Sequence, residues 1–177
     1  TAKQIAEATN SAYAEYAEYL ESIRTEGEKY IEKAKKTGKP VILLAGRPYH
    51  ADPEINHGIH ELISRLGAIV ISEDSVRPHN GKLDTNVRNQ WTYHARLYNA
   101  AKFVANAPEN LDIHLVQLVS FGCGVDAVTT DEVRSIVESS GRLYAQIKID
   151  EISNTGAVTI RLRSLMSVLE LRKNKKI

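Results

Sequence analysis

Residues 113–132 read IHLVQLVSFGCGVDAVTTDE, and this stretch indicates the fold class of the chain. Its first seven residues form an apolar run of the length expected for a buried strand. A loop follows in which glycines flank the single cysteine, Cys123, and a helical pattern follows the loop. We therefore expect Cys123 at the carboxyl end of a strand, which is the edge of an open α/β sheet where ligands collect.

Three further apolar runs, residues 41–45, 68–72 and 143–149, alternate with helical patterns. All these runs are nearly continuous rather than alternating, which is typical of parallel strands that are covered on both faces. Strands that alternate with helices imply a doubly wound parallel sheet with right-handed crossovers. We expect an α/β fold with a flavodoxin-like sheet of four parallel strands in the order 2-1-3-4.

A long amino-terminal helix, residues 1–38, is expected to pack on an α/β domain of residues 39–177. Apolar residues recur in it at helical spacing, and Gly38 with the proline two residues later is a helix-end signal. We interpret its tyrosines, Tyr13 and Tyr16 among them, as packing residues rather than as a binding face.

The other predicted helices lie between the strands. One begins near Pro53 with Asp52 as its N-cap, and one begins at Thr129 with a capping box. Within the helix expected over residues 86–107, Trp91 and Tyr98 are assigned to the core. The full set spans about residues 53–66, 86–107, 129–140 and 156–172.

The composition excludes several classes of protein. The net charge of +1 argues against general nucleic-acid binding, which needs a basic surface. No apolar run reaches the length of a membrane span, so we expect no membrane insertion. One cysteine excludes an internal disulfide framework and fits a cytoplasmic location. Because the chain starts without methionine and ends in a basic tail, we expect it to be part of a larger protein.

The order 2-1-3-4 places the topological switch point between the first and third strands. The loop after the first strand, residues 46–50, is then expected beside the cysteine loop, with residues 73–75 and 150–154 flanking both. Arg47 in that loop either binds a phosphate or carboxylate, or pairs with Glu73 or Asp74. No dinucleotide fingerprint or P-loop surrounds it.

Two readings of Cys123 stay open from the residues alone. It is either a thiolate, as an iron–sulfur ligand or a nucleophile near a helix N-terminus, or a small buried packing residue. His57 and His60, one turn apart, are interpreted as one polar helix face rather than a metal site, since no third ligand is specified. Gln90 and His94 are interpreted as a solvated flank of their helix.

Four segments together resemble a known family: LLAGRPYHADPEINHGI, QWTYHARLY, LVQLVSFGCGVDAVTTDEV and KIDEISNTGAVTIRLRSL. They are similar to acyl-CoA dehydratase activase-related proteins, also described as 2-hydroxyglutaryl-CoA dehydratase activators or CoA-substrate-specific enzyme activases. The matching segment of those proteins is the one similar to the D-component of 2-hydroxyacyl-CoA dehydratases. The resemblance extends over nearly the whole chain.

The resemblance implies a cytoplasmic iron–sulfur protein of anaerobic metabolism. Such dehydratases use a [4Fe–4S] cluster to pass one electron to a CoA thioester, and the activase hydrolyses ATP to drive that transfer. Cys123 matches the cluster cysteine of this domain, so it is the expected metal ligand. Because the strand-end loops are expected to converge, Arg47, Tyr49 and His50 are expected to line the acyl-CoA pocket. The chain lacks further cysteines and ATPase motifs, so the implied partners are other domains of a parent protein.

Two other interpretations stay open. In the first, the chain is a non-catalytic interaction module that docks partner domains through its first helix, with Cys123 as a packing residue. In the second, the chain binds a flavin at the switch point. Exposure of Cys123 at a concave face would count against simple packing and so against the interaction module.

Overall fold

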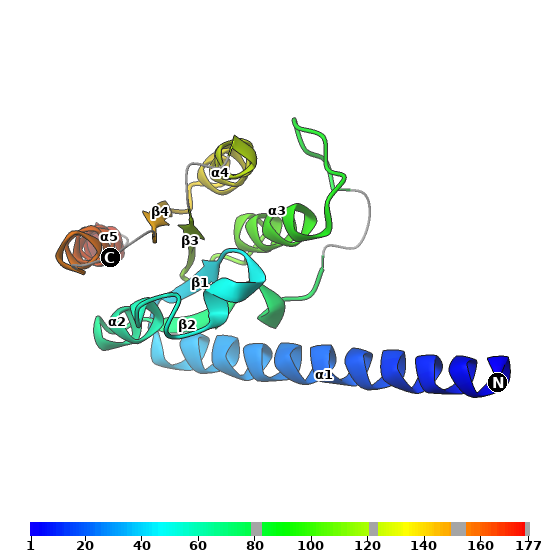
Figure 1. The fold of residues 1–177 in the computed structure, drawn as a ribbon. Helices are drawn as coiled ribbons and strands as arrows, with labels where there is room; N and C mark the ends of the chain where they lie inside the picture. Colours follow the sequence, from blue (N-terminus) through cyan, green and yellow to red (C-terminus); the bar gives the residue numbers. More distant parts are fainter. Residues whose placement is uncertain (79–82, 121–123, 150–154, 176–177) are drawn as a thin grey trace.

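The computed structural model describes residues 1–78, 83–120, 124–149 and 155–175. Within them, one sheet of four parallel strands has the order β2-β1-β3-β4, as the sequence predicts (Figure 1). The strands are β1 (Val41–Ala45), β2 (Ile69–Ser72), β3 (Ile113–Val119) and β4 (Tyr144–Lys148). β1 pairs with β3 in a register that places Leu43 beside Leu115.

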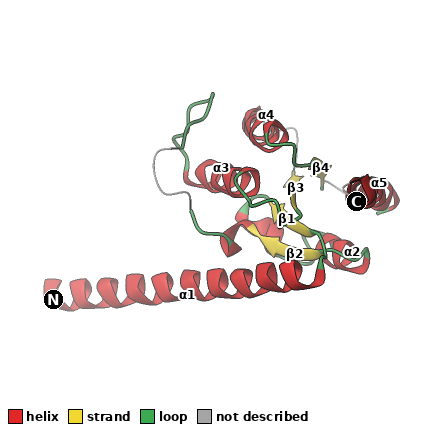
Figure 2. Ribbon diagram, turned by 180° about the vertical axis from the view of Figure 1, so that it is seen from behind, coloured by secondary structure: helices red, strands yellow, loops and turns green. Residues whose placement is uncertain are grey.

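Helices cover both faces of the sheet (Figure 2). Side chains of α2 (Ile59–Arg65) and α5 (Gly156–Lys175) pack against one face. The other face packs against α3 (Thr92–Ala105), α4 (Gly124–Ser139) and the carboxyl-terminal part of α1 (Ala2–Thr37). Two short 3-10 helices follow these strands: η1 (Pro48–Ala51) begins two residues after β1, and η2 (Glu73–Ser75) follows β2 directly.

The core lies on both faces of the two central strands. Every residue of β3 is buried, which explains why its sequence is apolar apart from His114 and Gln117. Successive side chains of a strand point to opposite faces, so Ile42 packs with α2 and α5 whereas Leu43 packs with α3 and α4. Each fully buried aliphatic side chain contributes about 1.5–3 kcal/mol of stability.

α1 packs on the domain over its carboxyl-terminal part. Gly27, Ile31 and Ala34 are buried, whereas every residue from Thr1 to Tyr19 is exposed. Figure 1 shows this amino-terminal half projecting away from the sheet. The helix ends where it is expected to end, because Gly38 adopts the left-handed conformation and donates its N–H to the Ala34 carbonyl.

The predicted start of the second helix at Pro53 is wrong. Asp52 does cap a turn there, since its Oδ1 accepts hydrogen bonds from the N–H groups of Glu54 and Ile55. The chain then turns at His57 and Gly58, which both have positive φ, and α2 begins only at Ile59. Left-handed residues of this kind interrupt a right-handed helix.

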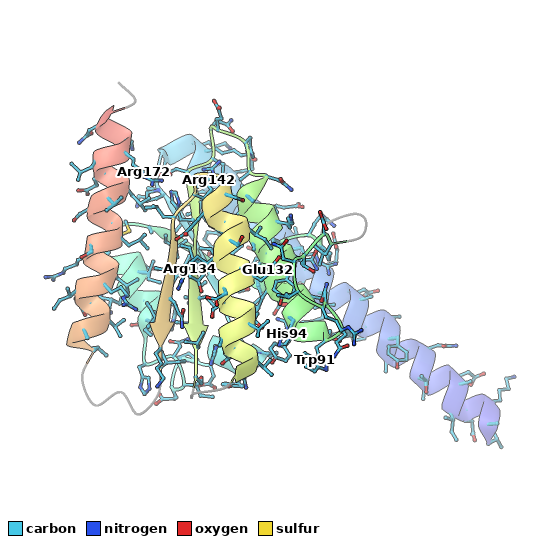
Figure 3. All side chains as sticks on the ribbon, turned by 90° about the horizontal axis from the view of Figure 1, so that it is seen from above. Trp91, His94, Glu132, Arg134, Arg142 and Arg172 are labelled. Atoms are coloured by element: carbon cyan, nitrogen blue, oxygen red, sulfur yellow. The ribbon has the colours of Figure 1, made fainter. Side chains whose placement is uncertain are left out.

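The boundaries of two further helices also differ from the predictions. α3 begins at Thr92, so Trp91 precedes it and is 50% exposed rather than part of the core (Figure 3). Tyr98 is buried, as predicted. α4 contains Thr129 rather than beginning at it, and the Thr129 hydroxyl donates to the Val125 carbonyl within the helix.

Gly27 provides a test of how α1 is fixed to the domain. A Cβ at this position would overlap the carbonyl oxygen and side chain of Ser75 in η2. Gly27→Ala is therefore expected to lower the free energy of unfolding by about 1–3 kcal/mol, because overpacking outweighs the better helix propensity of alanine. Urea denaturation followed by circular dichroism measures the change.

The matched control is Gly124→Ala at the start of α4, where an added Cβ meets nothing within 4 Å. Its free energy of unfolding is expected to change by less than about 1 kcal/mol. Equal stability of Gly27→Ala and the wild type would contradict the close packing of α1 on η2.

Candidate functional site

Three strand ends come together at the carboxyl edge of the sheet. β1 leads into Gly46 and η1, β2 leads into η2, and β3 leads into Ser120. Two side-chain contacts join the segment after β1 to the segments after β3, across sequence separations of 70 and 79 residues. The loop after β1 therefore contacts Ser120 and the first turn of α4, whereas the cysteine loop itself, residues 121–123, lies outside the described residues.

His50 is fixed between two of these segments. It is buried, and its Nδ1 accepts a hydrogen bond of 3.1 Å from the N–H of Arg47. The neutral ring then carries its proton on Nε2, which donates to the Ser120 hydroxyl at 2.6 Å. Burial, followed by the nearby Arg47 cation, lowers the pKa of His50, which favours this neutral form. A side chain on Gly46 would overlap the imidazole, so glycine is required there.

Arg47 pairs with a residue that the sequence did not indicate. Its Nη2 donates to Oδ1 of Asp126 at 2.8 Å, and its Nε donates to the same oxygen at 3.3 Å. Arg47 also lies over the ring of Tyr93, with 5.6 Å between the guanidinium carbon and the ring centroid. Asp126 lies in the first turn of α4, a favourable place for a carboxylate. Pairing of Arg47 with Glu73 or Asp74, one of the two alternatives, is therefore wrong.

Arg96 of α3 forms the ion pairs with Glu73 and Asp74 of η2 instead. Its Nη2 donates to Asp74 Oδ1 at 2.7 Å and to Glu73 Oε1 at 3.3 Å. The pKa of Glu73 is raised to about 7; burial is the main cause and the Asp74 carboxylate adds to the rise, whereas Arg96 opposes it. Glu73 is therefore a carboxyl group that gains and loses its proton near neutral pH.

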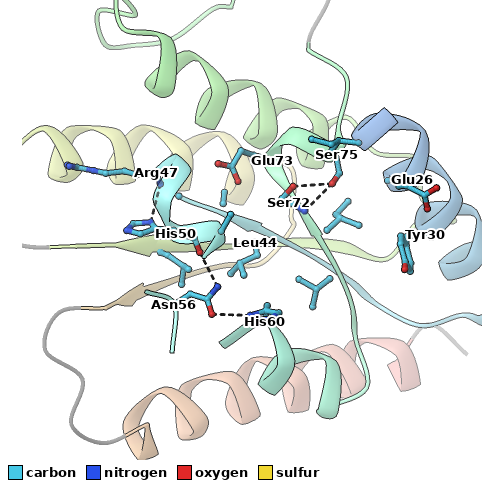
Figure 4. Close-up of a pocket in the computed structure, with 18 of the residues that line it drawn as sticks. Glu26, Tyr30, Leu44, Arg47, His50, Asn56, His60, Ser72, Glu73 and Ser75 are labelled. Atoms are coloured by element: carbon cyan, nitrogen blue, oxygen red, sulfur yellow. Dashed lines mark hydrogen bonds between the residues drawn. The ribbon is translucent and has the colours of Figure 1, made fainter. Parts of the chain in front are cut away.

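A cavity of about 720 Å³ opens between these strand ends and α1 (Figure 4). Arg47, His50 and Glu73 line one side of it, and the apolar side chains of Leu44 and Val70 line its floor. The α1 wall was not predicted from the sequence. It is formed by Ser22, Ile23, Thr25, Glu26, Gly27 and Tyr30.

The other two expected site residues differ in what the structure describes of them. Tyr49 is exposed and does not line the cavity, and its ring stands edge-on to His50 with 4.6 Å between the ring centroids. Cys123 lies outside the described residues, as do the flanking residues 150–154. Ser120 follows the last residue of β3, and Gly124 is the first residue of α4. These two residues lie on either side of the cysteine loop.

Other polar residues near the cavity serve the local structure. His60 lines the cavity, and its Nδ1 donates to the Asn56 side chain, whose amide in turn donates to the His50 carbonyl at 3.1 Å. His57 lies in the preceding turn. Within the described parts of the chain, no group of three or more histidine, cysteine, aspartate or glutamate residues is placed to hold a metal ion.

His94 departs from its predicted position. Gln90 is exposed, in agreement with a solvated flank, but His94 is buried between the edges of Trp91 and Tyr93 (Figure 3). Its Nε2 and the Oδ2 of Asp126 are both buried, and neither has a hydrogen-bond partner among the described residues. Burial lowers the pKa of His94. The ring is therefore favoured in its neutral form beside the Arg47–Asp126 pair.

The fold places the chain among the doubly wound parallel α/β proteins, with a cavity at the carboxyl edge of the sheet. Residues 1–76 match the model of a family described as the CoA enzyme activase uncharacterised domain. This match, which covers less than half of the chain, supports a relation to CoA enzyme activase proteins. No curated protein and no solved structure matches the chain. Among the described residues, no helix is both long and apolar enough to span a membrane.

The raised pKa of Glu73 predicts how stability depends on pH. An unfolded glutamate has a pKa of about 4.3, whereas the folded value is about 7. Between these two pH values the folded state keeps the Glu73 proton that the unfolded state has lost. The stability that this proton contributes is complete below the unfolded pKa and is lost as the pH rises through 7. In the wild type the free energy of unfolding is expected to fall by up to about 3 kcal/mol over this range because of Glu73, and in Glu73→Gln this decrease is expected to be absent.

Urea denaturation at about pH 5 and about pH 7.5 measures this effect in the wild type and the variant. The exposed Glu61 of α2 provides the matched control, since Glu61→Gln is expected to keep the pH dependence of the wild type. An unchanged pH dependence in Glu73→Gln would show that Glu73 is ionised throughout this range.

Proposed function

We propose that the chain is one domain of a cytoplasmic iron–sulfur protein related to acyl-CoA dehydratases and their activases. In this proposal the cavity takes the acyl end of a CoA thioester, and Cys123 is one ligand of a [4Fe–4S] cluster. The parent protein would carry out ATP-driven radical dehydration of a 2-hydroxyacyl-CoA or activate the enzyme that does so. The cavity at the carboxyl edge of the sheet carries the proposal, because Arg47 and His50 line it and all its lining residues except Leu118 lie in the segment that matches the CoA enzyme activase family.

The size and chemistry of the cavity fit an acyl group. Ligand sites for small molecules usually have volumes of about 300–1,000 Å³ and a mainly apolar lining with a few polar groups, and this cavity measures about 720 Å³. Its cation, Arg47, is already paired with Asp126 at 2.8 Å. A neutral, largely apolar ligand therefore suits the cavity better than a second anion.

The cysteine content decides how a cluster would be held. A [4Fe–4S] cluster is usually bound by four thiolates, and Cys123 is the only cysteine of the chain. A cluster bound through Cys123 therefore needs its remaining ligands from outside this chain. We infer that the other domains of the parent protein supply them, and that the isolated chain has neither the cluster nor dehydratase activity.

The cluster ligand can be tested in the full-length protein that carries this domain. Iron, acid-labile sulfide and the EPR spectrum of the reduced protein are measured after anaerobic purification. Cys123→Ala is expected to lose the [4Fe–4S] signal or convert it to another cluster type, because one thiolate is missing. Ser140→Ala, directly after the carboxyl-terminal end of α4, is the control and is expected to keep the cluster.

An unchanged cluster in Cys123→Ala, or none in the wild type, would contradict the ligand assignment. Either result would favour the alternative function, a non-catalytic interaction domain in which Cys123 is a packing residue. The exposed amino-terminal half of α1 is the observation that favours this alternative.

The acyl site can be tested separately by blocking the cavity from the α1 wall. Ser22 lines the cavity and is exposed, so Ser22→Trp fills space without disturbing the core. We expect it to weaken the binding of a short-chain acyl-CoA by more than about tenfold in titration calorimetry. Ser11→Trp, on the projecting half of the same helix, is expected to bind as the wild type does.

Free coenzyme A is titrated in parallel to separate the acyl group from the nucleotide. Loss of acyl-CoA binding in both tryptophan variants would indicate a general effect of the substitution. Equal, unweakened binding in Ser22→Trp would place the acyl group elsewhere.

A further inference from the structure

Glu73 is a buried carboxylate of the cavity wall whose ion pair is incomplete. Its side chain is 8% exposed and belongs to η2, directly after β2. Arg96 pairs with both carboxylates of η2 through one nitrogen, Nη2, which lies 2.7 Å from Asp74 but 3.3 Å from Glu73. One cation cannot compensate two carboxylates fully, so a proton is bound most readily by Glu73, the more buried of the two.

The other charged and titratable groups around this part of the cavity are engaged in contacts of their own. They come from α1, from α2 and from the segments that follow β1 and β3. The contacts are Arg24 with Glu21, Glu26 with Lys29, His60 with Asn56, His50 with Ser120 and Arg47 with Asp126. Tyr30 of α1 also lines the cavity. The charge of the wall near Glu73 therefore depends mainly on Glu73 itself and on its two neighbours, Asp74 and Arg96.

The hydrogen-bonding character of Glu73 depends on its proton. Burial is the main cause that raises the pKa of Glu73 to about 7, so the proton is present at and below neutral pH. A protonated carboxyl group donates a hydrogen bond, whereas an ionised one only accepts. The cavity wall therefore presents a donor at this position under these conditions.

A ligand in the cavity would change the surroundings of this carboxyl group. Leu44 and Val70 give the cavity an apolar floor, and Figure 4 shows Glu73 beside Leu44 in the wall. A neutral ligand that fills this space displaces water from Glu73. Loss of water disfavours the ionised form of a carboxyl group, so such a ligand favours the protonated form further. Ligand and proton therefore bind cooperatively.

We propose that Glu73, as the neutral acid, donates a hydrogen bond to the carbonyl oxygen of the acyl group in the cavity. This inference rests on the proposed function, which places the acyl end of a CoA thioester there. Glu73 then determines specificity, because it favours a ligand with an oxygen acceptor at this point over one without it. Arg96 and Asp74 are positioning residues, since they hold the Glu73 side chain and set the cost of its charge.

The pH dependence of binding follows from the protonation of Glu73 in the free chain. Below about pH 7 Glu73 already carries its proton, so the affinity for the acyl group is constant. Above this pH the proton must be taken up from solution when the ligand binds. The affinity therefore falls as the pH rises through 7, until the pH exceeds the higher pKa of Glu73 in the complex.

A matched pair of ligands tests this arrangement in the wild type. Butyryl-CoA has the carbonyl oxygen, and S-butyl-CoA, a thioether, lacks it. Titration calorimetry is expected to show that butyryl-CoA binds about threefold to tenfold more tightly at about pH 6.5. Its affinity is expected to fall at least about fivefold by about pH 8.5. Buffers of different ionisation enthalpy are expected to show uptake of about half a proton at about pH 7.5.

Two variants separate the donor from the charge. Glu73→Gln keeps a donor and cannot ionise, so it is expected to bind butyryl-CoA at both pH values as the wild type does at the lower one, without proton uptake. Glu73→Met is neutral but has no donor, so it is expected to bind the two ligands equally at both pH values. Glu61→Gln, on the exposed side of α2, is the control and is expected to behave as the wild type. Circular dichroism checks that each variant is folded.

The outcomes distinguish this inference from the function on which it rests. Equal binding of butyryl-CoA and S-butyl-CoA to the wild type would overturn the role of Glu73 and leave the acyl site in place. Proton uptake that persists in Glu73→Gln would do the same. If neither ligand binds more tightly than free coenzyme A, the acyl site itself is wrong, and the role of Glu73 is overturned with it.

Discussion

The parallel pairing of β1 with β3 is the constraint on which the site depends. These strands are separated in sequence by β2 and α3, and their pairing brings the ends of both strands to the same point of the sheet edge. Two contacts exist only because of it, namely His50 with Ser120 and Arg47 with Asp126. A different strand order would leave the Arg47 cation and the buried Asp126 carboxylate without each other, at the cost of an uncompensated buried charge.

The charged groups around the cavity are arranged so that few free charges face it. Arg47 is paired, His50 is held neutral by its hydrogen bonds and burial, and Glu73 shares Arg96 with Asp74. In a site of low polarity, a single unpaired charge would dominate the choice of ligand. Here the shape of the cavity and the proton of Glu73 have that influence instead, which is consistent with our proposal of an uncharged acyl group.

The sequence predicted the sheet well because apolar runs report burial directly. Strand number, direction and order all followed from four such runs and the rule for doubly wound sheets. Helix boundaries were predicted less well. His57 adopts a positive φ, which delays the start of α2, and a histidine in the sequence does not indicate that conformation. The predicted start of the helix at Thr129, five residues after the observed start of α4 at Gly124, also left Asp126 out of the possible partners of Arg47. The α1 wall was missed because exposed helix residues, such as Ser22, carry no signal of the cavity that they border.

The boundary of the family match coincides with a boundary in the cavity. All its lining residues except Leu118 lie between residues 22 and 75, and the matched segment ends at residue 76. The first part of the chain thus encodes the shape of the cavity, whereas the later part contributes Ser120 and Asp126, which hold that shape from outside. Nearly all the substitutions that would widen or narrow the cavity of this chain therefore fall within the segment that the family model covers.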